Sequence, residues 1–368
     1  MPFSKKCLSI TPSATLALSA KAKELKEEGR DVVEFGAGQP DFDTPEYIKD
    51  AARDALDQGK TKYTPASGIP RLKQAICEKF QKDNGLTYAP GQIVVTNGAK
   101  HALFNTFFAL LNPGDEVLIP SPYWTTYPEI VKMADGEPVY INTDEASGFK
   151  MTPDQLADAI GPKTKAVILN SPSNPTGAVY EKEDLLALGE VLRKHSVYIV
   201  TDEIYERFVY DGIVHHSLAA LCPDLADRTI IINGVSKTYA MAGWRIGYCV
   251  GNEQIVQALG QIKGYFDYGI FSAIQVAGII ALRDCDETIP VLAKTYETRR
   301  DVLCSGLSRM GWDITPPKAG MFVWARIPAP FDKMGAMQFA IEMMNRANVA
   351  VAPGTGFSEE GEGYLRLA

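Results

Sequence analysis

Several side chains capable of chemistry stand directly after apolar, β-rich runs. Lys237, in Ser236-Lys237-Thr238, follows the run Thr229 to Ile232 and precedes a segment rich in small residues. A lysine at the end of a buried strand loses solvation, which lowers its pKa and suits the amine to Schiff-base chemistry. Most lysines near strand ends are simply solvated, so this position needs support from elsewhere in the chain.

A carboxylate occupies a comparable position after the apolar run Val197 to Val200. Asp202 lies there, within Thr201-Asp202-Glu203-Ile204-Tyr205. An aspartate at a strand end can pair with a protonated pyridine nitrogen, which keeps that ring electron-withdrawing. Aspartate is also a favoured helix N-cap, so the position alone leaves both interpretations open.

Two turns add amides and backbone donors. The turn Asn170 to Gly177 carries Asn174 between prolines, where its amide could hold a phenolate oxygen, although such a composition also suits an ordinary turn. In Thr96-Asn97-Gly98-Ala99-Lys100, a strand-like run meets a helix-like one, and small residues there could cradle a phosphate. Neither a P-loop nor a G-x-G-x-x-G fingerprint occurs, so this turn alone is generic.

The elements that must position these residues alternate between strand and helix from residue 90 to 250. The predicted strands are Ile93 to Thr96, Glu116 to Ile119, Pro138 to Ile141, Ala166 to Leu169, Val197 to Thr201, Thr229 to Ile232 and Ile246 to Val250. The predicted helices include His101 to Leu111, Pro153 to Ile160 and Lys182 to Lys194. This alternation predicts an α/β fold: one seven-stranded, mostly parallel sheet sandwiched by helices. Ligands on such sheets bind at the carboxyl ends of the strands, where the residues above lie.

Both ends of the chain are predicted to form a smaller α+β domain beside this sheet. Residues 1–45 form an N-terminal arm and part of the small domain, 46–280 the large domain, and 281–368 the C-terminal small domain. The segment Lys263 to Ala281 reads as a long helix interrupted near Gly269. Arg299 and Arg300 are predicted to lie in a solvated helix.

Composition excludes several classes of function. The 368 residues are 46% hydrophobic and carry a net charge of −8, which disfavours nucleic acid as a partner. The six cysteines are scattered, without a C-x-x-C pair or histidines beside them, so neither disulfides nor a metal site are predicted. No run of about 18 apolar residues could span a membrane, and no signal peptide is recognised, so a cytoplasmic protein is expected.

Taken together, the motifs make the chain resemble the class I/II aminotransferases, enzymes of pyridoxal 5′-phosphate (PLP) fold type I, from about Pro12 to Leu367. Asn174-Pro175-x-Gly177, Asp202-x-x-Tyr205, Ser236-Lys237 and Arg245 follow the order and approximate separations of that family. The resemblance implies that Lys237 is the Schiff-base lysine and general base. It further implies that Asp202 pairs with the pyridine nitrogen, while Tyr205 and Asn174 hold the phenolic oxygen.

The resemblance also implies the remaining ligands. Those of the cofactor phosphate are Gly98, Ala99, Lys100, Ser236 and Arg245, and Trp124 stacks on the cofactor ring unless it is plain core. Substrate-binding residues are Gly38, through its backbone N–H, Trp124, Asn174 and Arg366. Tyr63 matches a tyrosine that reaches the phosphate of the neighbouring subunit, which implies a homodimer, unless Tyr63 is an ordinary loop residue.

The activity implied is ping-pong transfer of an amino group between an L-amino acid and 2-oxoglutarate. Residues up to about 210 are most similar to prokaryotic aspartate aminotransferases, whereas Asp267 to Phe271 and Lys318 to Trp324 are more similar to alanine-forming transaminases. Aspartate and alanine therefore both stay open, and no arginine between 260 and 300 is assigned to a second substrate carboxylate. The family normally continues for another helix beyond Arg366, so the small domain is expected to be incomplete or to lack that helix.

Two alternatives keep the same fold. A C–S β-lyase or another fold type I PLP enzyme would use the same lysine, aspartate and arginine. A PLP-binding effector domain of a regulator would follow a DNA-binding region, whereas here the enzyme-like pattern begins by Pro12. A nicotinamide dehydrogenase is excluded because no glycine fingerprint follows any strand.

Overall fold

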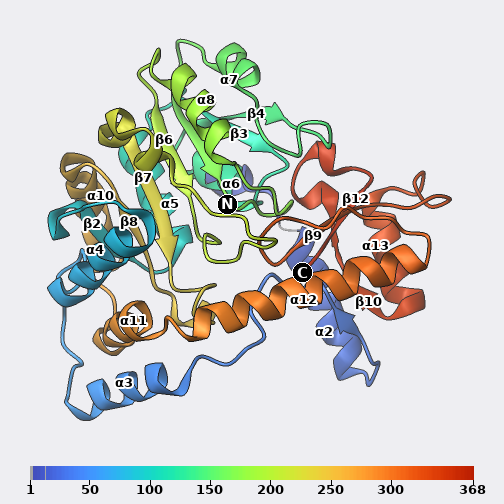
Figure 1. Cartoon of the computed structure of the whole chain (residues 1–368), viewed down its shortest axis with the longest axis horizontal. Coiled ribbons are helices and arrows are strands. Elements are labelled where there is room, and N and C mark those ends of the chain that lie inside the picture. The colour runs from blue at the N-terminus through green and yellow to red at the C-terminus, as the bar shows by residue number, and fades with distance from the viewer. Residues whose placement is uncertain (1–2, 13) are drawn as a thin grey trace.

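The computed structural model describes residues 3–12 and 14–368 and is built around one large sheet (Figure 1). The strands lie in the order β2-β8-β7-β6-β5-β3-β4. Their bounds are β2 Ile93–Thr96, β3 Glu116–Ser121, β4 Glu137–Asn142, β5 Thr164–Asn170, β6 Tyr198–Asp202, β7 Thr229–Gly234 and β8 Gly247–Val250. All seven predicted strands are confirmed, with ends that move by up to two residues.

Strand direction brings the carboxyl ends together. Neighbouring strands pair in parallel except β8, which is antiparallel to both β7 and β2. Because β2 and β7 both run opposite to β8, β2 points in the same direction as the parallel strands of the sheet. The predicted site residues that follow β2, β5, β6 and β7 therefore start from the same edge of the sheet.

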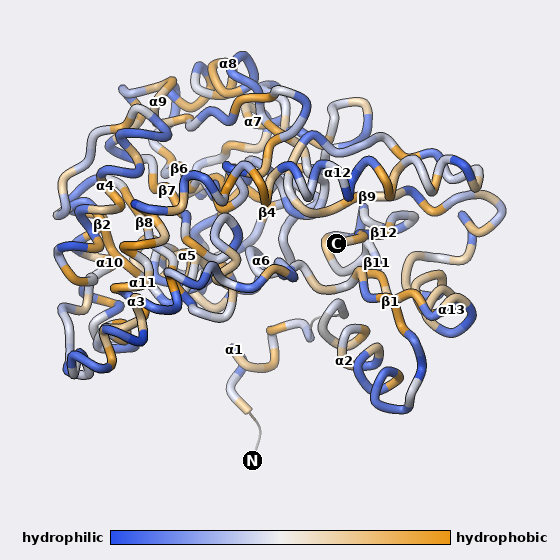
Figure 2. The backbone as a smooth tube through the Cα atoms, turned by 60° about the horizontal axis from the view of Figure 1, so that its bottom comes forward, coloured by the Kyte–Doolittle hydropathy of each residue, from blue (hydrophilic) through white to orange (hydrophobic). Residues whose placement is uncertain are grey.

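Helices cover both faces of the sheet, as the nearly continuous burial of residues in strands such as β2, β7 and β8 requires. Val94 packs in a core with α5, α6 and α10, whereas Ile93 and Val95 face a core that includes α3, α4 and α11. A third core lies under α7 and α8. In Figure 2, β2 and β8 are largely hydrophobic in colour, and the helices around them alternate between hydrophobic and hydrophilic. The helices are α3 Glu46–Asp57, α4 Pro70–Asn84, α5 Ala99–Leu110, α6 Thr126–Met133, α7 Pro153–Ala159, α8 Lys182–Leu192, α9 Leu218–Leu221, α10 Glu253–Phe266 and α11 Ser272–Asp284.

The predicted break near Gly269 is confirmed. Helix α10 ends at Phe266 and α11 begins at Ser272, with φ of 57° at Tyr268 and 128° at Gly269 between them. A positive φ is costly for most residues and free for glycine, so the chain turns here instead of continuing the helix.

Both chain ends meet in a smaller α+β unit. Strand β1 (Val33–Glu34) pairs with β10 (Val349–Ala350), and a three-stranded sheet has the order β11-β12-β9. The helix α12 runs from beneath the large sheet to this unit (Figure 1). The remaining bounds are α1 Lys5–Leu8, α2 Ala14–Glu27, α12 Thr288–Arg309, β9 Val323–Arg326, α13 Ala336–Ala347, β11 Ala352–Pro353 and β12 Tyr364–Leu367.

Within the described ranges, none of the helices combines the length and the apolar character that crossing a membrane requires.

Candidate active site

A cavity of about 1130 Å³ opens at the carboxyl edge of the large sheet. The predicted residues that line it are Gly38, Ala99, Lys100, Trp124, Asn174, Asp202, Tyr205, Ser236, Lys237, Arg245 and Arg366. Gly98 and Tyr63 are not among the lining residues. Topology thus gathers most of the predicted site from segments that are far apart in the sequence.

Lys237 follows β7 and points into this cavity. Its Nζ donates a hydrogen bond of 2.6 Å to the carbonyl oxygen of Gly38 and lies 6.0 Å from the centre of the Tyr205 ring. Burial lowers the pKa of Lys237 to about 8, and the nearby guanidinium groups of Arg366 and Arg245 act in the same direction. An amine with that pKa has a substantial neutral fraction near pH 8, as nucleophilic attack on a carbonyl requires.

Asp202 ends β6 at the floor of the cavity, 98% buried. Its Oδ2 accepts a 2.7 Å hydrogen bond from the Tyr127 hydroxyl, and its Oδ1 accepts a 3.3 Å bond from the backbone N–H of Ile204. Burial raises the pKa of Asp202 to about 6, against the lowering effect of the Tyr127 bond. No lysine or arginine of the described residues forms an ion pair with Asp202. A cationic ring nitrogen would supply the missing countercharge.

Sequence reasoning missed Tyr127. It lies on α6, between Thr126 and Pro128, and is 2% exposed. The pattern Tyr-Pro on a helix is no signal of a role in catalysis, because the contact with Asp202 crosses 75 positions of the chain.

Arg366 and Asn174 meet across the cavity. Arg366 donates 3.1 Å from Nη1 to Oδ1 of Asn174 and 2.6 Å from Nη2 to the carbonyl of Gly36. The guanidinium lies between the rings of Phe322 and Phe357, at 4.4 and 4.6 Å from their centres. Burial lowers the pKa of Arg366 to about 10. Within the described residues no carboxylate pairs with it, and its buried Nε has no partner, so it is suited to a ligand carboxylate.

The turn before α5 has the shape of an anion cradle. Of the three predicted backbone donors, the N–H of Gly98 is already bonded to the carbonyl of Thr96 at 2.8 Å. Ala99 and Lys100 are the first two residues of α5, and their N–H groups have no acceptor among the described residues. Gly98 has a φ of 82°, and a side chain there would overlap the Arg245 guanidinium. Gly98 therefore permits a close approach rather than donating itself.

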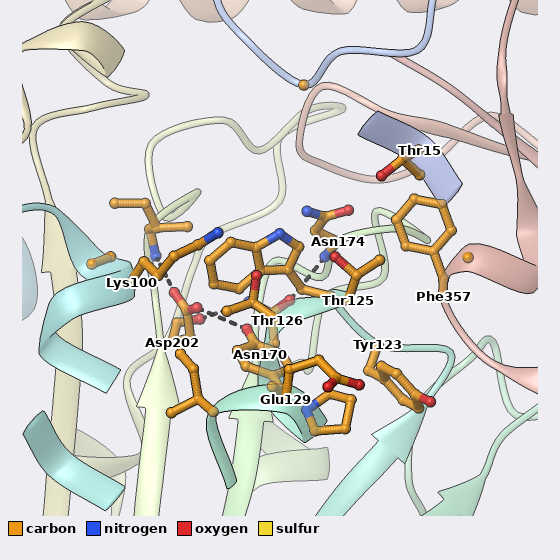
Figure 3. A pocket seen from close by; sticks show the side chains of 18 of the residues that line it. Thr15, Lys100, Tyr123, Thr125, Thr126, Glu129, Asn170, Asn174, Asp202 and Phe357 are labelled. Atoms are coloured by element: carbon orange, nitrogen blue, oxygen red, sulfur yellow. Dashed lines mark hydrogen bonds between the residues drawn. The ribbon is translucent and has the colours of Figure 1, made fainter. Parts of the chain in front are cut away.

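Lys100 also extends its side chain into the cavity. In Figure 3, Lys100 and Asn174 lie above Asp202, which stands at the strand ends. The Nζ of Lys100 lies 5.2 Å from the centre of the Trp124 ring, and burial lowers its pKa, with Arg245 contributing. No carboxylate of the described residues pairs with this ammonium. The sequence pointed to Lys100 as a backbone donor, and its side chain adds a cation that sequence reasoning had not used.

The placements of four other residues refine the predictions. Gly38 presents its carbonyl oxygen to Lys237, and the role of its N–H toward the substrate stays a prediction. Tyr63 is 87% exposed, with its ring 4.9 Å from that of Tyr268. The prediction that Arg300 is solvated was wrong: Arg300 is 8% exposed because it forms a two-pronged pair with Asp211, at 2.6 and 2.9 Å. Arg299 is exposed and pairs with Asp41 at the surface.

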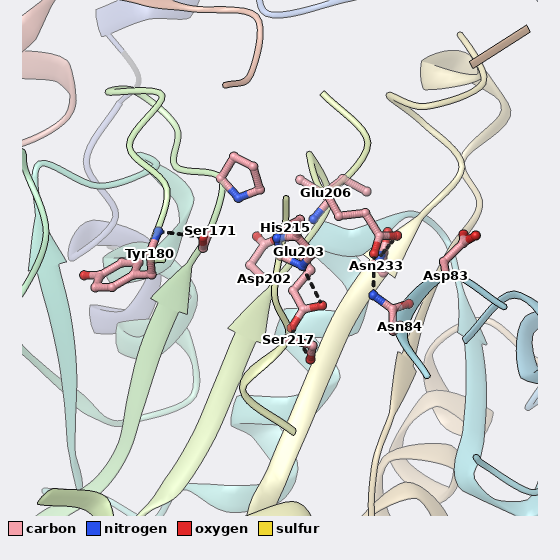
Figure 4. Close-up of polar contacts among 12 residues, drawn as sticks. Asp83, Asn84, Ser171, Tyr180, Asp202, Glu203, Glu206, His215, Ser217 and Asn233 are labelled. Carbon is pink, nitrogen blue, oxygen red and sulfur yellow. Dashed lines mark hydrogen bonds and ion pairs between the residues drawn. The ribbon is translucent and has the colours of Figure 1, made fainter. Parts of the chain in front are cut away.

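A buried polar network lies behind the site and fixes the turn after β6 (Figure 4). Glu203 accepts a 2.8 Å bond from Ser217 and lies 3.2 Å from His215 Nε2. Glu206 pairs with Lys79 and accepts from Asn233. The carboxylates and His215 lie close enough to hold a metal ion, but Lys79 already supplies a positive charge to Glu206. Although burial acts in the opposite direction, Lys79 and His215 lower the pKa of Glu206 to about 2.

The donor set fits PLP. Lys237 offers an amine to an aldehyde, and Asp202 offers a ring nitrogen a carboxylate without a countercharge. The N–H groups at the start of α5 and the nearby guanidinium of Arg245 suit a phosphate. Trp124 is available beside the cavity to lie against a ring. These functions match the aldehyde, the ring nitrogen, the phosphate and the aromatic ring of that cofactor.

Comparisons with known proteins agree over almost the whole chain. The family model for class I and II aminotransferases matches residues 30–368. An aspartate aminotransferase of Geobacillus stearothermophilus is 46% identical over 361 residues, which cover 97% of this chain and 92% of the relative. A probable aspartate/prephenate aminotransferase of Thermus aquaticus is 44% identical over 369 residues, covering 100% and 94%.

Solved structures show the same likeness. Aspartate aminotransferase of Thermus thermophilus with maleate matches with a TM-score of 0.95 at 41% identity, covering 100% of this chain and 95% of the other. The aspartate aminotransferase of Rhizobium meliloti matches with a TM-score of 0.94 at 40% identity, covering 100% and 94%. Members of this family have PLP fold type I and use PLP as their cofactor. The chain belongs to the class I and II aminotransferases and is a PLP-dependent enzyme that transfers amino groups.

Proposed function

We propose that this enzyme transfers the amino group of an L-amino acid to 2-oxoglutarate by a ping-pong mechanism, with aspartate favoured over alanine as donor. Lys237, Asp202 and Tyr205 are the proposed catalytic residues. The observation that carries the proposal is the convergence of the Lys237 amine, the Asp202 carboxylate and the Arg366 guanidinium on one cavity. PLP, when bound, supplies the aldehyde and the electron-withdrawing ring that make the α-hydrogen of an amino acid acidic.

Lys237 holds and moves the proton. With its pKa lowered to about 8, its Nζ can accept the proton from the α-carbon of the substrate and deliver it to a second carbon within reach of the same amine. Asp202 keeps the ring nitrogen protonated because its carboxylate, once ionised, stabilises a cation in a buried place. Tyr205, buried beside Phe322, orients the phenolic edge of the cofactor together with Asn174.

Arg366 binds the α-carboxylate common to donor and acceptor. Its planar guanidinium already bonds to Asn174 and lies against two aromatic rings, which fix its plane before the substrate arrives. A bidentate pair with a carboxylate orients the α-carbon as well as holding it.

Lys100 is the proposed cation for a second carboxylate. Lys237 is engaged with the cofactor, Arg245 lies at the phosphate turn and Arg366 takes the α-carboxylate, whereas the Lys100 ammonium has no ion-pair partner in the described structure. Both aspartate and 2-oxoglutarate carry a second carboxylate, and alanine does not. This placement, and the relatives named for aspartate, favour aspartate as the donor.

We also propose that the active enzyme is a homodimer in which Tyr63 reaches the phosphate of the neighbouring site. Aromatic side chains exposed on this part of the surface support it: Tyr63 at 87%, Tyr265 at 92% and Tyr268 at 66%. Isolated exposed rings are ordinary, but several together indicate a surface that another chain covers. Sedimentation velocity of the wild type against Tyr63→Arg tests the assembly.

The proposed division of the chain remains 1–45, 46–280 and 281–368, and residue 280 falls within α11, which packs on α3. A cytoplasmic location is likewise proposed, supported by six cysteines that are all unpaired.

An assay of the purified protein, supplied with PLP, tests the proposed activity. Aspartate with 2-oxoglutarate should give oxaloacetate and glutamate, detected by coupled malate dehydrogenase and chromatography, with alanine in a parallel reaction. Release of ammonia and pyruvate from a cysteine thioether without any oxo acid would instead support the β-lyase alternative. Faster reaction with alanine than with aspartate would overturn the proposed donor.

A further inference from the structure

A fully buried lysine lies behind the phosphate turn. Lys263, on α10, is 0% exposed, and its Nζ donates to Oδ1 of Asp267 and to the carbonyl of Ala66, both at 2.7 Å. Burying an ammonium is costly unless charge and hydrogen bonds compensate it. The structure compensates Lys263 with two acceptors that belong to different segments of the chain.

Asp267 connects this lysine to the phosphate turn. Its Oδ2 accepts a 2.6 Å bond from the side-chain amide of Asn97, the residue that precedes Gly98. The carbonyl of the same Asn97 accepts a 3.3 Å bond from Nη2 of Arg245. His101 faces the same carboxylate, with Nδ1 at 3.5 Å from Oδ2. One carboxylate thus fixes the side chain of the residue whose backbone holds Arg245.

The other acceptor connects Lys263 to the segment of Tyr63. Ala66 lies three residues after Tyr63, and between them the hydroxyl of Thr64 donates 3.2 Å to the carbonyl of Ile270. The Tyr63 ring packs on that of Tyr268, in the same link between α10 and α11. The link from Asp267 to Ile270 therefore contacts both segments that are proposed to reach a cofactor phosphate.

We propose that Lys263 and Asp267 are positioning residues for the cofactor phosphate, acting as one unit that holds the Asn97 turn and the Tyr63 segment in register. This inference rests on the proposed function, because it takes the turn before α5 as the phosphate site. Neither residue lines the cavity, so neither touches the substrate. Their effect is on how well PLP is held and not on the proton transfer.

The phosphate itself allows a selective test. The variants Lys263→Met and Asp267→Asn keep side-chain size and remove one charge each. Apoprotein is titrated with PLP and, separately, with pyridoxal, which has the same ring and aldehyde but no phosphate. Dissociation constants are read from absorbance and tryptophan fluorescence, and folding is checked by circular dichroism.

Each single variant should raise the Kd for PLP by about tenfold or more, the effect seen at metal sites when a residue that holds a ligating side chain is lost. The Kd for pyridoxal should change less than about twofold. The double variant should raise the Kd for PLP about as much as either single variant does, because the two residues act as one unit. Lys294→Met is the matched control: Lys294 also forms a 2.7 Å helix pair, with Glu297, but at the surface. Its Kd for PLP should equal that of the wild type.

An unchanged Kd for PLP in both folded single variants overturns the inference, as does an equal rise for PLP and pyridoxal. If Lys263→Met does not fold, Asp267→Asn alone decides, because its amide keeps the size of the carboxylate. Failure of the proposed function is distinguishable, because the wild type would then bind PLP without transferring the amino group of aspartate to 2-oxoglutarate, and the comparison of Kd values would still be informative.

Discussion

The hydroxyl of Tyr127 donates a 2.7 Å hydrogen bond to the buried carboxylate of Asp202. Burial raises the pKa of Asp202 to about 6, and this bond acts against that rise. The carboxylate must be ionised to pair with a protonated ring nitrogen, so Tyr127 supports the charge state on which the cofactor depends.

Replacing Tyr127 by phenylalanine should therefore raise the pKa of Asp202. The acidic limb of the pH profile of kcat/KM should move to higher pH by about one unit, because one hydrogen bond to the charged form is lost. Tyr180→Phe is the matched control, since its buried hydroxyl bonds to the backbone of Met151, away from Asp202. An unshifted acidic limb in Tyr127→Phe would show that the bond does not govern this ionisation.

Lys237→Ala should lower kcat by at least about 10²–10⁴-fold, the range that a positioned proton-transfer group contributes. The variant should also lose covalent attachment of the cofactor, while its circular dichroism stays that of the wild type. Mass spectrometry after borohydride reduction measures this directly: the wild type gains the mass of the reduced cofactor. The same gain in the variant would mean that another amine carries PLP.

The lowered pKa of Lys237 also predicts that the free energy of unfolding of the cofactor-free protein depends on pH. Its pKa is about 8 when folded and near 10.4 in an unfolded chain, so the unfolded state binds more protons between these values. The free energy of unfolding should thus rise as the pH increases from 8 to about 10.4. Lys237→Met should abolish this contribution and stabilise the apoprotein at pH 7 by about 1–3 kcal/mol, measured by urea unfolding. Equal free energies of unfolding at pH 7 would contradict the claim that burying the Lys237 ammonium destabilises the folded apoprotein.

Lys100→Met tests the second carboxylate site. The specificity kcat/KM for aspartate should fall about 10- to 100-fold, because a cation that lines the cavity is lost, whereas that for alanine should stay within about twofold. Lys165→Met is a suitable control, since Lys165 also lies over an aromatic ring, that of Tyr198, but outside the cavity. Equal losses for aspartate and alanine would assign Lys100 to the cofactor and not to the substrate side chain.

Much of the large sheet and its edge could be predicted from the sequence, because both depend on local patterns. Apolar runs such as Ile93 to Thr96 form strands because their alternate residues enter two separate cores. Residues that follow parallel strands, such as Asp202 and Lys237, share one edge for topological reasons. Motif order then connected these positions to a known family.

Long-range contacts made by helix residues could not be predicted. Tyr127, Lys263 and Arg300 all lie on helices and bond to Asp202, Ala66 and Asp211, which are 75, 197 and 89 positions away in the sequence. A charged or aromatic residue at helical spacing has the same pattern whether it faces water or a buried partner. Arg300 was expected in water for that reason, and only the packing of Asp211 against α12 shows otherwise.

The pairing of β1 with β10, and the bond from the N–H of Ala368 to the carbonyl of Phe35, join segments more than 300 positions apart. During synthesis, the strands of the large sheet leave the ribosome well before residues 349–368 do. The sheet and its lysine can consequently form early, whereas Arg366 reaches Asn174 and Gly36 only after the last strand has emerged. A nascent chain can thus acquire the elements that hold its cofactor before it can bind a substrate carboxylate, which delays turnover until β12 has been translated.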